Sequence, residues 1–224
     1  VTEETFELRG SLKLAAPLTF GLVHMSEAIA DFLKMHPAIE LKLDLNDRNI
    51  NLVEEGFDMA VRIGKLEDST LVSKRLGTSH HTTCASQSYI DTHGEPRHPD
   101  ELQQHIGLQY SNIAYKQQWR YETPEGKTIH ARPQIRIRAS NGELLAAAAS
   151  AGLGITTGPT FILGKYIKDG DLVSILNDYQ RPSVGIYAVY PPGRLIPRRI
   201  QVFSDFLAGR YGEHPYWDNG LRAS

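Results

Sequence analysis

The chain has 224 residues, 41% of them hydrophobic and 22% charged, and its formal net charge is −2. This composition is typical of a globular protein with one large or two small domains and a proper core. The charge balance gives no sign of a nucleic-acid-binding surface. No apolar run approaches the roughly 18 residues that span a membrane, so we expect no membrane partner.

Cysteine usage and the first residues bear on where the protein works. Cys84 is the single cysteine, which excludes an intramolecular disulfide and favours a reducing compartment. The opening VTEETFELRG has neither the basic nor the apolar region of a signal peptide, and no initiator methionine. We therefore expect a cytoplasmic protein, either processed or part of a longer chain.

Strand and helix patterns alternate in the first part of the chain. Polar and apolar residues alternate over Ser11 to Ala16, Glu40 to Leu45 and Phe57 to Ile63, which predicts three strands. A short helix is predicted from a cap at Asn49 to Gly56. The first two strands flank a longer helical pattern whose apolar face is Leu22, Met25, Ile29, Phe32 and Leu33. This order predicts an α/β fold with a parallel sheet.

The second part of the chain is less regular. A hairpin is predicted from Trp119–Tyr121 and Thr128–His130, and an alanine-rich helix from Gly142 to Ala151. An amphipathic helix from Pro197 to Tyr211 closes the fold, and the residues from Gly212 on are expected to fray.

Several motifs suggest chemistry only at first sight. AGLGITTG, from Ala151 to Gly158, has the glycines of a dinucleotide fingerprint, but its helix precedes its strand, so a glycine helix cap explains it better. His80, His81 and Cys84 lack the spacing of a metal site, and Cys84 is expected to be a buried apolar residue. There is no GxSxG elbow. We therefore expect no enzyme, no metal and no cofactor.

Two segments are better candidates for a binding site. Leu18, Thr19 and Phe20 follow the first strand and open the first helix, where free backbone N–H groups attract anions. Arg62, Ile63 and Gly64 lie at the carboxyl end of the third strand. In open α/β sheets, ligands bind at the carboxyl ends of strands. The hydroxyl of Thr19 fits a helix cap equally well, and Arg62 fits an internal ion pair as well as a ligand contact.

The same segments carry a resemblance to a known family. Several strings occur in order and at the family's spacing over roughly residues 10 to 208: GSLKLAAPLTFG, LNDRNINLVEEGFDMAVRIGKLEDSTLVSKRL, CASQSYIDTHGEPRHPDEL, HIGLQYS, AAAASAGLGITTGP and YPPGRLIPRRIQVFSDFL. Together they resemble the effector-binding (substrate-binding) domain of LysR-type transcriptional regulators.

The resemblance implies a periplasmic-binding-protein type of α/β fold, with two Rossmann-like lobes joined by two crossover strands. The crossings are placed near Leu76 to Ala85 and Leu176 to Ser183. Residues 1–9 would then be the remnant of a linker, and the chain would divide as follows: lobe I at 10–78 and 181–211, lobe II at 79–180, and a tail at 212–224.

In this family a small-molecule effector binds between the lobes. We expect a small anionic effector held by Leu18, Thr19, Phe20, Arg62, Ile63 and Gly64 on one side, and by Ser86, Asn141 and Thr157 on the other. Asn141 is also expected to cap the alanine-rich helix. Relatives commonly have an apolar residue where this chain has Thr157, so the pocket is expected to be more polar.

The resemblance also implies partners. Regulators of this family bind DNA through an N-terminal winged helix-turn-helix, which this sequence lacks, so the chain alone is expected not to bind DNA. An antiparallel homodimer is implied, in which the helix at 21–34 packs against the helix at 143–151 of its mate. A free-standing solute-binding protein of the same architecture is the alternative.

Overall fold

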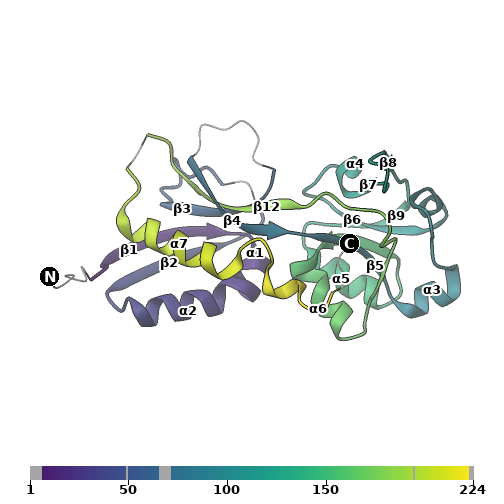
Figure 1. Ribbon diagram of the computed structural model, residues 1–224, viewed down its shortest axis with the longest axis horizontal. Coiled ribbons are helices and arrows are strands. Elements are labelled where there is room, and N and C mark those ends of the chain that lie inside the picture. Colours follow the sequence, from purple (N-terminus) through teal and green to yellow (C-terminus); the bar gives the residue numbers. More distant parts are fainter. Residues whose placement is uncertain (1–6, 49, 66–71, 194, 222–224) are drawn as a thin grey trace. The chain divides into compact units, whose positions relative to one another are not determined.

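The computed structural model describes residues 7–48, 50–65, 72–193 and 195–221 (Figure 1). Its contacts divide the chain into two compact units. Unit 1 comprises Val1–Thr78 and Val184–Pro215, and unit 2 comprises Ser79–Ser183 and Tyr216–Ser224. Each unit is built on its own sheet, and the predicted two-lobed α/β class is confirmed.

Unit 1 contains a sheet with the strand order β2-β1-β3-β12-β4. Its strands are β1 (Gly10–Ala16), β2 (Ile39–Leu45), β3 (Met59–Gly64), β4 (Val72–Ser79) and β12 (Val184–Tyr190). As the order of strands and helices predicts, β1 runs parallel to both β2 and β3, whereas β12 runs antiparallel to β3. The parallel strands therefore end at a common edge.

Helices cover the sheet of unit 1. α1 (Leu18–Phe20), the π-helical turn η1 (Gly21–Met25) and α2 (Ser26–Met35) follow one another without a break, and α2 contacts α7 (Arg198–Tyr211). The ring of Phe32 packs edge-on against that of Phe203, with 4.8 Å between their centroids. A side chain at Gly21 would clash with Leu45, so this glycine lets the helix approach β2 closely.

The π-helical turn corrects one sequence expectation. Met25 and Phe32 are buried as predicted, but Leu22 is 58% exposed. A π-turn places an extra residue in the helix and shifts the phase of the residues before it, so Leu22 leaves the inner face that regular α-helical spacing predicts. Ala28, expected beyond that face, is buried.

Unit 2 contains a sheet with the order β11-β5-β10-β6-β9. The strands are β5 (His81–Ala85), β6 (Ile106–Tyr110), β9 (Gln134–Ala139), β10 (Ile155–Pro159) and β11 (Val173–Ile175). β6 is parallel to β9 and β10, but β5 is antiparallel to β10. The predicted hairpin is confirmed as β7 (Arg120–Glu122) paired with β8 (Thr128–His130).

The helices of unit 2 include two that the sequence patterns did not identify. These are α3 (Gln87–His93) and the short α4 (Tyr115–Gln118), together with the 3₁₀ segment η2 (Pro99–Gln104). α5 (Gly142–Ser150) and α6 (Thr160–Lys168) lie against each other. A buried core that includes Tyr89, Trp119 and Tyr121 joins the hairpin to the sheet.

Two local predictions were wrong. The short helix expected before Gly56 is a series of turns, and Asn49, its expected cap, lies outside the described residues. The end of the chain does not fray at once. η3 (Tyr216–Asp218) belongs to unit 2, Trp217 is 5% exposed, and Asp218 lies 2.7 Å from the Nδ1 atom of His80. Burial of the indole offsets the entropy that ordering this segment costs.

Candidate functional site

The two candidate segments of unit 1 lie at the same edge of its sheet. β1 and β3 are adjacent and parallel, with Leu14 opposite Met59 and Ala15 opposite Ala60. Leu18–Phe20, which follow β1, and Arg62–Gly64, which end β3, therefore come together at the carboxyl ends of two neighbouring strands. This edge is where open α/β sheets bind ligands.

The start of the first helix already has an acidic partner. The backbone N–H of Leu18 donates to the carboxylate of Asp47 at 3.0 Å. Thr19 is 6% exposed, and Phe20 is fully buried with its ring 5.3 Å from that of Tyr211. Packing within unit 1 thus accounts for Phe20 without a ligand, and an internal carboxylate takes part of the anion-binding capacity of the helix start.

Arg62 is held by a backbone carbonyl. Its Nη2 atom donates to the carbonyl of Ile50 at 2.8 Å. None of the ion pairs found among the described residues includes Arg62. Within the described residues, the guanidinium is therefore oriented by a neutral group rather than by a carboxylate.

In unit 2, Asn141 follows β9 and Thr157 lies in β10, and both strands run parallel to β6. The side-chain carbonyl of Asn141 accepts from the backbone N–H of Leu144 at 3.0 Å, so the predicted cap of α5 is confirmed. The hydroxyl of Thr157 donates to the carbonyl of Thr82 at 3.0 Å and is buried. Asn141 follows the carboxyl end of β9, which is on the same edge of the sheet as the end of β10.

The structure does not bring Ser86 together with Asn141. Ser86 follows the carboxyl end of β5, which runs antiparallel to β10, so it lies at the opposite edge of the sheet. Its hydroxyl is near Gly152 at the end of α5, whereas Asn141 is at the start of that helix. Nine helical residues span about 13 Å. Ser86 instead caps α3 by accepting from the N–H of Tyr89.

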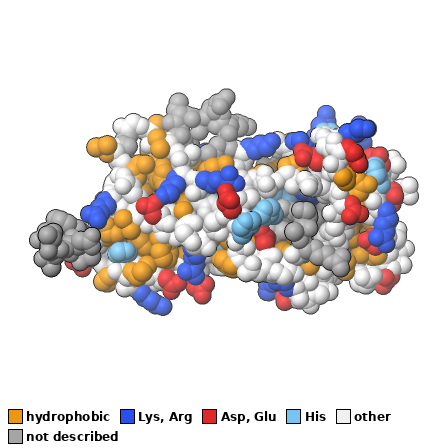
Figure 2. Space-filling model, viewed as in Figure 1, with side chains coloured by type: hydrophobic (Ala, Val, Ile, Leu, Met, Phe, Trp, Pro, Cys, Tyr) orange, Lys and Arg blue, Asp and Glu red, His pale blue; other side chains and the backbone are white. Residues whose placement is uncertain are grey.

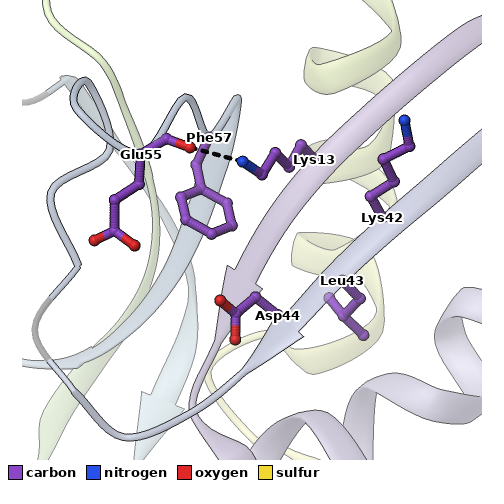
Figure 3. Close-up of a pocket in the computed structure, with 6 residues that line it drawn as sticks. All are labelled: Lys13, Lys42, Leu43, Asp44, Glu55 and Phe57. Atoms are coloured by element: carbon purple, nitrogen blue, oxygen red, sulfur yellow. Dashed lines mark hydrogen bonds between the residues drawn. The ribbon is translucent and has the colours of Figure 1, made fainter.

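A groove on unit 1 was not expected from the sequence (Figure 3). It has a volume of about 210 Å³ and is lined by Lys13, Lys42, Leu43, Asp44, Glu55 and Phe57. Its charges have partners within the chain. The ammonium of Lys13 donates to the carbonyl of Glu55 at 2.7 Å and lies over the ring of Phe57, and Arg48 forms a bidentate pair with the Glu55 carboxylate. The groove therefore has little charge left for a ligand.

A second cavity lies within unit 2, and its polar residues were also missed. It is lined by residues of β5 and of the segment after β11, including His81, Thr82, Thr83, Leu176, Asn177 and Arg181. Because β5 is antiparallel to β10, with His81 opposite Pro159, the start of β5 lies at the carboxyl edge of β10. No sequence pattern indicates the direction of β5, so His81 was interpreted as an ordinary strand residue and not as part of a cavity.

Features associated with catalysis are not supported by their surroundings. Cys84 is fully buried, and burial raises the pKa of its thiol, so the thiolate that a nucleophile needs is disfavoured. The described residues contain no group of three or more side chains suited to hold a metal ion. In AGLGITTG, α5 precedes β10 and Gly152 has a φ of 78°, as the glycine-cap interpretation predicts. No helix in the described ranges is long and apolar enough to cross a membrane.

Comparison with known proteins identifies the family. The profile of the LysR substrate binding domain matches residues 7–212. An uncharacterised HTH-type transcriptional regulator of Haemophilus influenzae is 36% identical over 200 residues, which are 89% of this chain and 69% of the relative. The HTH-type transcriptional activator AaeR of Escherichia coli is 29% identical over 91% of this chain and 66% of its own length.

Solved structures agree with this relationship. The regulatory domain of CrgA, a LysR-type regulator of Neisseria meningitidis, superposes with a TM-score of 0.79 at 29% identity, covering 92% of this chain and all of that domain. Full-length AphB, a virulence activator of Vibrio cholerae, gives a TM-score of 0.76 at 28% identity. The superposed residues make up 90% of this chain but 68% of AphB, so the chain corresponds to part of a regulator of that length.

Proposed function

The chain belongs to the LysR family of transcriptional regulators, and we propose that it senses a small anionic effector on behalf of a longer, DNA-binding protein. The match to the LysR substrate binding domain over residues 7–212 carries the assignment as an effector-binding domain. A free-standing solute-binding protein is not favoured, because the relatives are regulators of transcription. We propose no catalytic role for the same reason.

The anionic character of the effector is argued from the carboxyl edge of unit 1. Arg62 supplies a positive charge there, and its partner is a backbone carbonyl rather than a carboxylate. Ile63, Gly64 and the half-buried Leu18 lie at the same edge. A guanidinium that is already oriented and has no acidic partner among the described residues suits a carboxylate group, which it can hold through two parallel hydrogen bonds.

Thr157 and Asn141 are the corresponding groups of unit 2, at the carboxyl edge of its own sheet. The expectation that one effector contacts residues of both units stays a prediction. Ser86 is not proposed as a contact of the same small molecule as Asn141, since the two residues lie at opposite edges of the sheet.

A thermal-shift screen of small carboxylic acids, each paired with its uncharged amide, tests the anionic effector. We expect one or more acids to raise the unfolding temperature, their amides to have no effect, and Arg62→Gln to abolish the response. Arg198→Gln removes an exposed arginine of the same unit and should leave the response intact. Equal responses to acids and amides, or an unchanged response in Arg62→Gln, would contradict the proposal.

The longer protein is proposed to bind DNA through a winged helix-turn-helix outside this chain and to act in the cytoplasm, where a regulator reaches the chromosome. Two relatives support this, because they are named HTH-type regulators and extend beyond the part that this chain matches.

We also propose a homodimer in which residues 21–34 contact residues 143–151 of the mate. Exposed apolar side chains on both segments support it. Leu22 is 58% exposed, Val23 52% and Leu144 52%. Hydrophobic side chains also gather on the visible face of unit 1 near α2 (Figure 2). Exposed apolar clusters on a surface commonly mark an interface, and a two-fold axis would form this contact twice.

A further inference from the structure

Arg181 is a partly buried cation on the wall of a small cavity of unit 2. Its Nε and Nη1 atoms are inaccessible to solvent and have no hydrogen-bond partner among the described residues. None of the ion pairs in the described ranges includes it. Its guanidinium lies over the ring of Tyr121, 5.0 Å from the ring centroid. A ring face offsets only part of the free energy that is needed to remove an ion from water.

The unpaired atoms of Arg181 border the small cavity of unit 2. The cavity has a volume of about 10 Å³, which is about the space that one water molecule occupies. The Nδ1 atom of His81 is on the same wall and is also buried without a partner in the described part of the chain. The hydroxyl of Thr82 is 2.9 Å from that of Ser174, which itself donates to the side-chain carbonyl of Asn177.

Among the described residues, no acidic side chain on the elements around the cavity compensates the charge of Arg181. Of the residues that line it, Arg181 carries a charge at neutral pH, whereas burial lowers the pKa of His81 and keeps its imidazole neutral. Asp178 is next to the lining residue Asn177 in sequence, but it is exposed and makes no ion pair with Arg181 within 4.0 Å. The potential inside the cavity is therefore positive.

The backbone beside the cavity is also unusual. Leu176 has a φ of 57°, and it is the one non-glycine residue with a positive φ among those described. This conformation costs a leucine about 1 kcal/mol or more, and such residues cluster at ligand sites. Leu176 is 7% exposed and belongs to the core of unit 2, so its side chain holds this backbone in place beside Arg181.

We propose that the cavity binds a small monovalent anion, either a halide ion or one carboxylate group, through the guanidinium of Arg181. The size of the cavity excludes a larger ligand as a whole, although the carboxylate of a larger molecule can enter it. The site lies within unit 2 and does not depend on the proposed effector contacts of Arg62.

Thermal unfolding in a sodium HEPES buffer, whose sulfonate group is bulkier than a carboxylate and does not fit a cavity of this size, tests this site. Sodium bromide, sodium acetate or more sodium HEPES is added at matched ionic strength. We expect bromide or acetate to raise the unfolding temperature saturably beyond the HEPES control. Arg181→Met keeps the aliphatic stem over Tyr121 but removes the charge, so it should lose this shift. Arg136→Met, at an exposed position of β9, should keep it.

The unfolding temperatures of Arg181→Met and of the unmodified chain are also compared without a small anion. In HEPES alone, Arg181→Met should unfold at the same temperature as the unmodified chain or higher, because it removes a buried charge that nothing neutralises. An unchanged anion response in Arg181→Met overturns the proposal. So does the absence of any response in the unmodified chain, combined with a lower unfolding temperature for Arg181→Met, since the guanidinium would then serve only to pack on Tyr121.

Crystals grown with bromide or with acetate distinguish the two sources. An anomalous bromide peak at the Nε and Nη1 atoms of Arg181 assigns a halide site, and acetate density there without a bromide peak assigns a carboxylate site. Both results support the proposal when the solution response requires Arg181. Bromide and acetate at other positions only, with the cavity holding water, would contradict it.

Discussion

The guanidinium carbon of Arg181 lies 5.0 Å from the centre of the Tyr121 ring, and the hydroxyl of that tyrosine is 2.9 Å from the hydroxyl of Thr83. Tyr121 thus contributes to the interior of unit 2 in two ways. Its ring face stabilises a buried cation, and its hydroxyl satisfies a buried polar group on β5. The side chain of Tyr121 therefore contacts both Arg181 and Thr83 of β5.

The Tyr121–Thr83 hydrogen bond predicts a non-additive pair of substitutions. Tyr121→Phe keeps the ring but leaves the hydroxyl of Thr83 without this partner, so the free energy of unfolding should fall by about 1–3 kcal/mol in urea denaturation. Thr83→Val should have a similar cost. The double variant should lose less than the sum, because neither partner is then left unpaired. Strictly additive losses would show that the two hydroxyls do not interact.

His81 predicts loss of stability in mild acid. Burial, together with the charge of Arg181, lowers the pKa of His81 from 6.5 to about 3 in the folded state. Below about pH 6.5 the unfolded chain takes up a proton that the folded chain does not, so this residue destabilises the fold increasingly as the pH falls towards 3.

Denaturation of the unmodified chain and of His81→Gln at a series of pH values measures this effect. Between pH 6.5 and 4.5 the unmodified chain should lose up to about 2 kcal/mol more than the variant. Arg181→Met should reduce the loss in part, since it removes the positive charge that helps to keep His81 neutral. Parallel curves for the unmodified chain and His81→Gln would show that His81 titrates normally in the folded state.

Substitutions of two adjacent leucines of α5 test folding and assembly separately. Leu145 is 2% exposed, whereas Leu144 is 52% exposed. Leu145→Glu places a charge in the core and should reduce the free energy of unfolding by at least about 3 kcal/mol. Leu144→Glu should leave the fold intact but convert the proposed homodimer into monomers in sedimentation equilibrium.

A control for this assembly is available on unit 1. Val23→Glu changes the other proposed contact segment and should give monomers as well, while Val53→Glu, an equally exposed valine outside both segments, should not. A monomeric unmodified domain at tens of micromolar, or a dimer that survives both Leu144→Glu and Val23→Glu, would rule out this interface.

The chain by itself should not recognise DNA. Its net charge is −2, and the resemblance places the DNA-reading element outside it. A gel-shift assay at physiological salt should therefore detect no sequence-dependent binding. Sub-micromolar binding that discriminates between duplexes would mean that unit 1 or unit 2 carries a DNA-binding surface of its own.

The sequence predicted the features that depend on local patterns. The alternation in β1 and β2 identified two strands, and Asn141 before an alanine-rich run identified a cap. Leu22 was misplaced because no sequence pattern distinguishes a π-helical turn from regular α-helix. The sequence also does not show which of the two leucines of α5 is buried, because hydrophobicity alone does not tell Leu144 and Leu145 apart.

The site was harder to predict because it depends on strand direction. Ser86 was expected beside Asn141 on the assumption that the residue after β5 shares an edge with the residue after β9, but β5 is antiparallel to β10. The same reversal brings His81 to the carboxyl edge of β10, near Arg181, which is 100 residues further along the chain. No local pattern carries that contact.

Backbone amide exchange, measured with and without the acid that gives the largest thermal shift, tests the proposed effector site most directly. Binding should protect the segments around Leu18–Phe20 and Arg62–Gly64, together with those at Asn141 and Thr157, because the ligand is expected at the carboxyl edges of the sheets. Protection confined to the groove between Lys13 and Phe57, or to neither set of segments while the acid is bound, would contradict this account.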